Sequence, residues 1–158
     1  MLFAEERPTL NAPADLHAKN TWCVLMVDDN AEVHTVTRLA LRGYEFQGRT
    51  LEFISAYSGE EGQQVFENRN DIALALVDVV MERDQAGLEL VDYVRHTLDN
   101  HCTRLVVRTG QPGSWSGAKS IEQYEIDDYR EKTDLTIQKL RTLLDCQLGA
   151  YREPTRLH

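Results

Sequence analysis

The sequence has little of what marks a disulfide-rich, membrane-spanning or nucleic-acid-binding protein. Its three cysteines, Cys23, Cys102 and Cys146, are odd in number and far apart, which fits neither a disulfide framework nor a zinc site. No apolar stretch is long enough to cross a bilayer, and the N-terminus lacks the basic-then-apolar order of a secretory signal. Only 17 Lys and Arg stand against 26 Asp and Glu, and a net charge of −9 opposes binding to nucleic acid or an anionic membrane. We therefore expect a cytoplasmic protein with reduced cysteines.

The 158 residues, 42% of them apolar, suit one compact domain with a full core. Residues 1–20 contain Pro8 and Pro13 among polar residues and predict an irregular arm. From residue 21 onward, short apolar runs alternate with segments of helical period, which indicates a βα repeat and a parallel sheet covered by helices. The predicted strands cover residues 22–27, 51–56, 72–77, 105–107 and, more weakly, 126–129.

Apolar residues three and four positions apart predict the helices that connect these strands. The first helix stops near Gly43, and the second opens with a capping box, Ser58 and Glu61, ahead of Val65 and Phe66. In the third helix we expect Arg95, like Glu89 and Asp92, to face water. A short fourth helix over 118–124 is poorly marked. The apolar positions of the first, third and last helices are Val33, Val36 and Ala40; Leu88, Val91, Val94 and Leu98; and Ile137, Leu140, Leu144, Leu148 and Tyr151.

Polar residues follow four of the predicted strands. Asp78 interrupts the apolar run of residues 72–81, and a lone carboxylate there calls for a cation, a hydrogen-bond network or a reaction. Asp28 and Asp29 follow the first strand, Thr109 the fourth and Lys132 the weak fifth. In open parallel sheets, functional groups gather beyond the carboxyl ends of the strands, so these residues are candidates for one site.

Three carboxylates brought together repel one another unless a cation offsets their charge, and Mg²⁺ is the natural partner of such oxygen ligands. Asp29 and Asp78 suit direct metal binding, with Asp28 acting through water. A carboxylate can also attack phosphorus to form an aspartyl phosphate while a metal and a lysine offset the charge of the phosphoryl oxygens. Lys132 fits the role of that lysine, and the Thr109 hydroxyl could hydrogen-bond a phosphoryl oxygen.

Each residue alone also has a structural explanation. Asp28 and Asp29, followed by Asn30, could cap the first helix, and Asp78 could be a turn residue bonded to backbone amides. Lys132 alone would be a solvated surface charge. The combination of all of them, in this order and each at a strand end, favours a functional site.

The chain resembles a response-regulator receiver domain of two-component signalling over residues 22–148. The resemblance implies a flavodoxin-like, doubly wound (βα)5 α/β fold with the strand order 2-1-3-4-5. It divides the chain into an arm over 1–20, a receiver over 21–148, and a tail or linker to an output domain over 149–158. The residues that carry it are Val24-Leu-Met-Val-Asp28-Asp29, Leu76-Val-Asp78-Val-Val-Met81, Val106-Val-Arg-Thr109-Gly110 and Asp127-Asp128-Tyr129-Arg-Glu-Lys132.

The resemblance also implies roles for the strand-end residues. Asp78 would be the phosphoacceptor, and Asp29, Asp78 and the backbone carbonyl of Val80 would bind Mg²⁺, with Asp28 supporting the metal through water. Thr109 would be the switch hydroxyl, Lys132 the phosphate-pairing lysine, and Tyr129 the aromatic residue that changes rotamer. The phosphodonor would be a sensor histidine kinase or phosphotransfer protein. The domain would be a switch acting on an output domain or partner protein, with a possible homodimer through helix four, strand five and helix five, and not an enzyme in its own right.

Several residues depart from the usual receiver pattern. Glu82 stands where the family usually has proline, and Gly87 lies one residue farther from Asp78 than expected. Thr133 replaces the proline that usually follows the lysine, and a non-proline cis bond there would cost about 3–4 kcal/mol. Arg130 and Glu131 replace apolar residues, which suggests a more exposed edge strand. The loops around the site are therefore expected to differ.

Three segments, residues 44–53, 109–113 and 150–152, look similar to a receiver subgroup that precedes further signalling domains. Some relatives of this kind carry cyclic-dinucleotide phosphodiesterase modules, and we expect no such module within this chain. Three rival functions are kept. A receiver-like scaffold would bind partners without phosphorylation, and the altered loops after Met81 and Lys132 make this conceivable. An aspartyl-phosphate phosphatase would need a second catalytic acid beside Asp78, and a flavodoxin-like cofactor binder would meet repulsion from the acidic turn after strand one.

Overall fold

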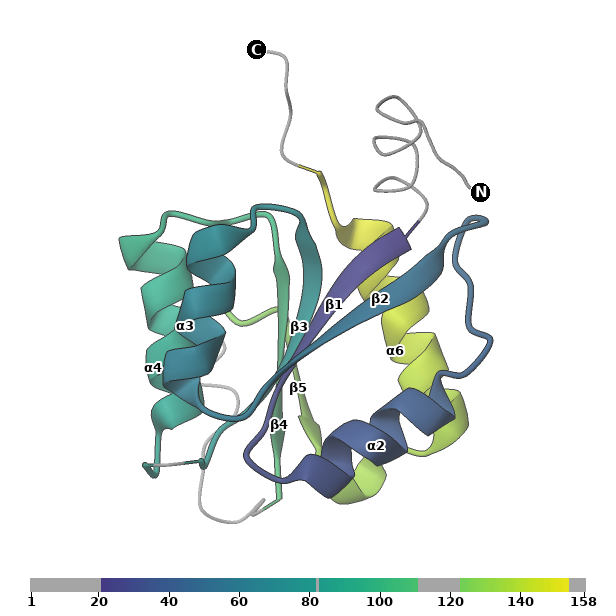
Figure 1. Ribbon diagram of the computed structural model, residues 1–158, viewed down its shortest axis with the longest axis horizontal. Coiled ribbons are helices and arrows are strands. Elements are labelled where there is room, and N and C mark those ends of the chain that lie inside the picture. The colour runs from purple at the N-terminus through teal and green to yellow at the C-terminus, as the bar shows by residue number, and fades with distance from the viewer. Residues whose placement is uncertain (1–20, 82, 111–122, 154–158) are drawn as a thin grey trace, which may run out of the picture.

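The computed structural model describes residues 21–81, 83–110 and 123–153. Their five strands form one parallel sheet in the order β2-β1-β3-β4-β5, which confirms the predicted flavodoxin-like order (Figure 1). The order reverses between β1 and β3, and in open α/β sheets ligands bind beyond the carboxyl ends of the strands at such a point. The strands are β1 (Thr21–Val27), β2 (Thr50–Ala56), β3 (Ile72–Asp78), β4 (Arg104–Thr109) and β5 (Asp128–Glu131).

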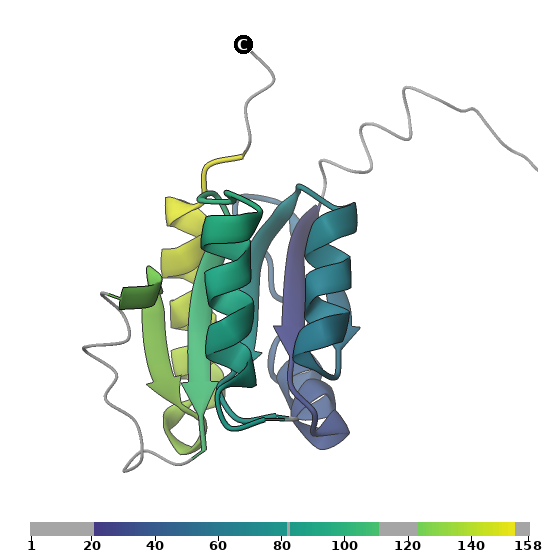
Figure 2. The same ribbon diagram turned by 90° about the vertical axis from the view of Figure 1, so that its left-hand side faces the viewer.

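Helices cover both faces of the sheet (Figures 1 and 2). On one face lie α2 (Ala31–Ala40) and α6 (Ile137–Ala150), and on the other lie α3 (Gly59–Asn68) and α4 (Ala86–Asp92). A π-helical turn over Tyr93–Thr97 continues α4, and a 3₁₀ turn over Lys132–Asp134 precedes α6. Every residue of β3 is buried, as expected for a central parallel strand covered on both faces.

The first helix forms where the spacing of apolar residues predicts it, but the residues that it buries are not those apolar residues. Asn30 caps α2 by accepting from the Glu32 amide, and Gly43 adopts the left-handed conformation, with φ 77°, in the turn that follows. The buried residues of α2 are His34 and Thr37, whereas Val36 is 57% exposed. Spacing alone shows that a helix has an apolar face, and it does not show that the core covers that face.

The third helix buries Leu88, Val91 and Val94 as predicted, but the expectation that Arg95 faces water is wrong. Arg95 is 4% exposed, and its guanidinium donates to three backbone carbonyls and to Asp127. It lies in the π-helical turn, where the wider i→i+5 spacing changes the phase of the side chains.

The fifth strand lies two residues later than predicted. It runs over Asp128–Glu131 and pairs only with β4, and all four of its residues are half-buried. The expectation of a more exposed edge strand at Arg130 and Glu131 is therefore confirmed. The predicted cap of the second helix is also present, because the Ser58 hydroxyl accepts from the Glu61 amide at 3.1 Å.

Some predictions fall on residues outside the described ranges. These are the arm over 1–20, Glu82, the residues 111–115 of the loop after β4, most of the short helix over 118–124, and residues 154–158. In the described part of the chain, no helix is long and apolar enough to cross a membrane.

The two ends of the described domain lie against each other. The ring of Tyr151, which follows α6, meets the ring of Trp22 at the start of β1 edge to face, with centroids 6.4 Å apart. The Arg49 guanidinium lies 3.6 Å from the centre of the same indole, and its Nη1 lies 3.7 Å from Glu153 Oε1. Trp22 also donates through Nε1 to the carbonyl of Phe46 at 2.9 Å. These contacts fix the end of α6 to the beginning of the sheet.

Candidate functional site

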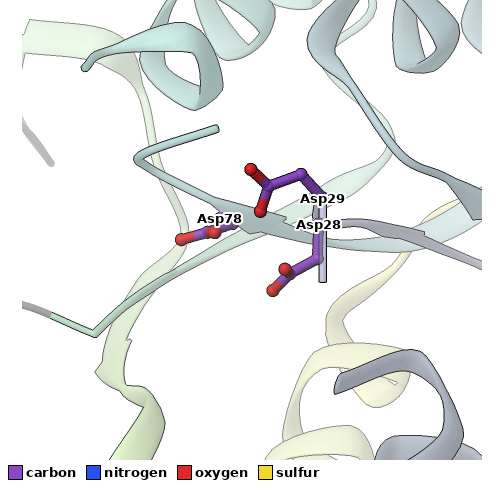
Figure 3. A group of neighbouring side chains, drawn as sticks. All are labelled: Asp28, Asp29 and Asp78. Atoms are coloured by element: carbon purple, nitrogen blue, oxygen red, sulfur yellow. The ribbon is translucent and has the colours of Figure 1, made fainter. Parts of the chain in front are cut away.

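Three carboxylates meet at the carboxyl edge of the sheet, as the strand-end pattern predicted. Asp28 and Asp29 follow β1, and Asp78 is the last residue of β3, so the neighbouring central strands bring them together. One oxygen from each lies within 4.8 Å of the others, and Figure 3 shows the side chains converging. Asp28 and Asp78 are buried, whereas Asp29 is exposed. The site is therefore a half-enclosed acidic cluster with one open side.

Lys132 closes this cluster from the end of β5. Its ammonium lies 2.9 Å from Asp28 Oδ2 and donates to Asp78 Oδ2 at 3.1 Å. Burial lowers the pKa of Lys132, but the contacts with Asp28 and Asp78 outweigh it and raise the pKa above its ordinary value. Lys132 therefore remains protonated as a fixed cation between the two buried carboxylates.

The Asp78 carboxyl is harder to ionise than an exposed aspartate. Burial raises its pKa to about 6, and the neighbouring charge of Asp28 adds to the increase. Lys132 acts in the opposite direction without cancelling these two effects. A further cation in the cluster would stabilise the ionised form, which is the form that can act as a nucleophile.

Backbone packing fixes the position of Asp78. The Val79 amide donates to the Arg108 carbonyl at 3.1 Å, so pairing of β3 with β4 continues past the carboxylate. The Gly87 amide, in the first turn of α4, donates to the Val79 carbonyl at 3.0 Å. A Cβ at Gly87 would overlap the carbonyl oxygen of Asp78 and would lie 2.8 Å from its carbonyl carbon. The helix can approach this closely only because residue 87 has no side chain.

Asp28 is held through both its backbone and its side chain. The carbonyl of Asp28 accepts from His34 Nε2 at 2.7 Å, and His34 Nδ1 lies 2.9 Å from Ser55 Oγ on β2. Asp28 Oδ1 accepts from the Asn30 amide at 2.9 Å. The motifs in the sequence did not point to His34 or Ser55. The only available signal was a histidine on the first turns of a helix that begins at the acidic pair.

The other predicted residues lie at the same edge. Thr109 is the last residue of β4 and is 2% exposed, and the half-buried Tyr129 lies on β5, where it pairs with Val107. Val80 lies two residues after Asp78 and is half-buried. The peptide bond between Lys132 and Thr133 is trans. Thr133, which stands where receivers usually have proline, lies in the 3₁₀ turn.

Arg108 is a second basic residue at this edge, and it was not among the predicted site residues. It is the partner of Asp78 in the β3–β4 register, and it is 4% exposed. A groove with a volume of about 280 Å³ passes beside it, walled mostly by apolar side chains of α2 and α6. An arginine inside the run Leu105-Val-Val-Arg108 was the available signal, because a charged residue interrupts a buried strand.

The donor set fits a hard divalent cation. Three carboxylates supply oxygen ligands, one of them open to solvent, and Mg²⁺ commonly binds through one or two carboxylates while keeping several waters. The described residues of the cluster supply no thiolate or imidazole ligand, which a softer metal would prefer.

No family model matches the chain. The 3′3′-cGAMP-specific phosphodiesterase 2 of Vibrio cholerae serotype O1 is 57% identical over 155 residues, a match that covers 96% of this chain. The chain spans about 30% of the length of that relative.

Solved structures share the fold. A CheY-like receiver domain protein from Methanospirillum hungatei is 24% identical, with a TM-score of 0.65 over 82% of this chain and 94% of that one. The receiver domain of an HD domain-containing protein from Pseudomonas fluorescens is 22% identical, with a TM-score of 0.66 over 82% and 88%. A response regulator in its Mn²⁺-bound form is 17% identical, with a TM-score of 0.67 over 85% and 99%. The architecture of this chain is therefore that of receiver domains.

Proposed function

We propose that this chain, which has the fold of response-regulator receiver domains, accepts a phosphoryl group on Asp78 and thereby switches a protein-interaction surface. The observation that carries the proposal is the contact of Asp78 with Lys132, at 3.1 Å, inside a cluster that also holds Asp28 and Asp29. Two buried carboxylates and one lysine, open on one side, match what an aspartyl-phosphate site requires.

The transfer exchanges one bond for another. An oxygen of Asp78 attacks the phosphorus of a phosphohistidine, the P–O bond forms as the P–N bond breaks, and the imidazole leaves with the electron pair of the broken bond. The Lys132 ammonium then offsets the charge of the phosphoryl oxygens. Asp29, Asp78 and the carbonyl of Val80 would hold Mg²⁺, with Asp28 acting through water, and the ion would supply further positive charge at the same oxygens.

The proposed switch passes through Thr109 and Tyr129. The Thr109 hydroxyl would move towards a phosphoryl oxygen on Asp78, and Tyr129, on the neighbouring edge strand, would turn inward. The test is to compare NMR spectra of the two residues with and without phosphorylation. Unchanged Thr109 and Tyr129 signals in the fully phosphorylated protein would contradict this mechanism.

Intact-mass spectrometry tests the phosphoacceptor directly. The protein is incubated with acetyl phosphate, with and without Mg²⁺, beside Asp78→Asn and Asp84→Asn. Asp84 is an exposed carboxylate in the loop that follows β3, so its substitution makes the same chemical change nearby. We expect one Mg²⁺-dependent phosphoryl adduct on the wild type and on Asp84→Asn, and none on Asp78→Asn. An adduct that survives in Asp78→Asn would place the phosphoacceptor elsewhere.

An apolar face lies next to the site, and we propose that a phosphodonor protein docks there. Val36 on α2 is 57% exposed and Ile137 on α6 is 61% exposed, and both line the same groove as Lys132. A donor must bring its phosphohistidine to Asp78, so its contact surface has to border Lys132. Exposed apolar residues at that border suit a partner that buries them on binding.

The relative suggests an output for the switch. A protein named 3′3′-cGAMP-specific phosphodiesterase 2 is 57% identical over nearly all of this chain, and we propose that the domain regulates a cyclic-dinucleotide phosphodiesterase module. In the test, this chain replaces the matching segment of the relative, and hydrolysis of 3′3′-cGAMP is measured. We expect acetyl phosphate to change the rate of the chimaera and to leave its Asp78→Asn variant unaffected. Equal responses of the two proteins would contradict the coupling.

A receiver-like scaffold that works without phosphorylation is the second candidate. The altered loop around Thr133 favours it, because a 3₁₀ turn with a trans peptide bond follows Lys132. The mass-spectrometric experiment separates the two functions. No adduct on the wild type with acetyl phosphate or a phosphorylated donor protein would support the scaffold.

A further inference from the structure

Arg108 is a buried guanidinium with few partners. It is 4% exposed, and its Nη1 donates to Thr37 Oγ1 on α2 at 3.2 Å. Its Nε and Nη2 groups have no hydrogen-bond partner in the described part of the chain. The adjacent groove is lined mostly by apolar side chains such as Val36, Ala40 and Leu140, and the one carboxylate in its lining, Glu32, is exposed. A buried charge that is incompletely bonded lowers stability, so its presence calls for a function.

The carboxylates that attract this guanidinium belong to the acidic cluster. Arg108 and Asp78 are register partners on adjacent strands, and both Asp78 and Asp28 attract the guanidinium. Burial lowers the pKa of Arg108, and the two carboxylates act against this decrease. An arginine stays protonated in proteins even when buried, so a permanent positive charge lies beside the cluster. Lys132 borders the same groove, which gives the three carboxylates two fixed cations.

We propose that Arg108 is a positioning residue that acts on the acidic cluster through its charge, weakening Mg²⁺ binding in the unphosphorylated site and stabilising the phosphoryl group once it is on Asp78. The inference rests on the proposed phosphoacceptor function. The same positive charge has opposite effects on the two ligands, because Mg²⁺ is positive and the phosphoryl group is negative.

The direction of each effect follows from electrostatics. Mg²⁺ is repelled by the guanidinium, while a phosphoryl group adds negative charge and is attracted to it. Water screens such interactions at the exposed Asp29, but Arg108 and the other two carboxylates are buried, so their charges are screened much less. We expect about a tenfold change in each binding constant when the charge is removed.

Four variants isolate the charge from the shape of the side chain. Arg108→Met and Arg108→Gln remove the charge, and Arg108→Lys keeps it. Arg42→Met removes the same charge from an exposed position at the far end of α2 and serves as the matched control. Circular dichroism and thermal unfolding check that each variant folds. We expect both neutral variants to fold, because the only hydrogen bond of the Arg108 side chain in the described part of the chain is the one to Thr37 Oγ1.

Isothermal titration calorimetry measures two ligands, Mg²⁺ alone and then beryllofluoride, a phosphoryl analogue, at saturating Mg²⁺. We expect Arg108→Met and Arg108→Gln to bind Mg²⁺ about tenfold more tightly and beryllofluoride several-fold more weakly, with Arg108→Lys and Arg42→Met close to wild type. Three outcomes would assign Arg108 a structural role and overturn the inference. The affinities for Mg²⁺ and beryllofluoride could fall together, neither affinity could change, or neither neutral variant could fold.

The same titrations separate this inference from the proposed function. If the wild type binds Mg²⁺ and beryllofluoride but the neutral variants bind both as the wild type does, only the role of Arg108 is wrong. If the wild type binds neither ligand, the metal-dependent phosphoacceptor site is wrong, and the role of Arg108 is overturned with it.

Discussion

Ionisation of Asp78 is less favourable in the folded protein than in the unfolded chain. Its pKa is raised to about 6 from the ordinary value of 3.8, so the folded state binds a proton more tightly than the unfolded state does. This favourable contribution is complete below pH 4, where Asp78 is protonated in both states. It is lost as the pH rises through 6. At neutral pH without metal, the buried charge of Asp78 therefore lowers the stability of the fold.

Asp78→Asn is accordingly expected to stabilise the metal-free protein at pH 7 by about 2 kcal/mol relative to its effect at pH 4. Lys132 keeps Asp28 as a partner in this variant, which limits the loss from the missing contact. Urea denaturation in EDTA at pH 4, 5, 6 and 7 measures the difference, with Asp84→Asn as the control for removal of an exposed carboxylate. A difference between Asp78→Asn and wild type that does not vary with pH would contradict the raised pKa.

The strand-end pattern predicted which carboxylates and which lysine would meet, because the carboxyl ends of parallel strands share one edge. It did not predict His34 or Arg108. His34 acts through a hydrogen bond to the backbone of Asp28, and a backbone acceptor leaves no mark in the sequence. Arg108 directly precedes Thr109 in the sequence. A charged residue inside a strand can reach solvent with its charged end or remain buried, and the packing around it determines which.

At the scale of elements, the contact of α4 with the end of β3 depends on Gly87. Gly87→Ala is expected to lower the free energy of unfolding by more than about 2 kcal/mol, because backbone atoms of Asp78 and Val79 occupy the place of the new methyl group. Gly149→Ala in α6 is the matched control. Its methyl group would lie 3.5 Å from Phe46, an ordinary contact, and the change should raise stability by up to about 1 kcal/mol.

Urea denaturation of the two alanine variants measures both effects. A Gly87→Ala variant as stable as wild type would show that α4 can move away from β3 without loss. In that case, the close approach at Asp78 would not be what positions the carboxylate.

The apolar face of α2 and α6 gives a prediction that separates partner binding from chemistry. Val36→Lys and Ile137→Lys, combined, should slow phosphorylation by a donor protein at least about tenfold while leaving the rate with acetyl phosphate unchanged, because buried interface positions disfavour charge. Gln64→Lys, on the exposed surface of α3 across the sheet, controls for added charge. Phosphorylation time courses with the two donors measure the rates. Equal slowing with both donors would place the effect in the site itself.

Helices and strands were predictable where one physical signal determined them. The capping residue Ser58 and the continuous apolar run of β3 gave the right elements. Two errors had tertiary causes. Val36 on α2 is exposed because this helix turns His34 and Thr37 towards the sheet, and Arg95 is buried because a π-helical turn rotates it towards backbone carbonyls.

At the scale of the whole molecule, a bound metal should stabilise the fold. A ligand that binds only the folded state at a hundred times its dissociation constant adds about 2.7 kcal/mol to the free energy of unfolding. Mg²⁺ should therefore raise the unfolding midpoint of the wild type and have little effect on Asp29→Asn, with a sodium salt at the same ionic strength as control. An equal increase in Asp29→Asn would show that Mg²⁺ stabilises the protein outside the acidic cluster.

The sheet order was predictable from the whole chain because the receiver resemblance rested on four separate segments. The position of β5 was not, since Arg130 and Glu131 lack the apolar signal of a buried strand. An edge strand gains much of its stability from pairing with one neighbour, here β4, and pairing over a separation of some twenty residues leaves no local pattern.

The contact of Trp22 with Tyr151 brings the two ends of the described chain close together. Because Arg49 reaches both Trp22 and Glu153, a short glycine-serine bridge could join residue 153 to residue 21 without disturbing the helices. The backbone could then be opened at Asn70, an exposed residue between α3 and β3, to give a circular permutant in which β3 comes first. The arrangement of the sheet would survive, because contacts between strands hold it in place and the order of synthesis does not.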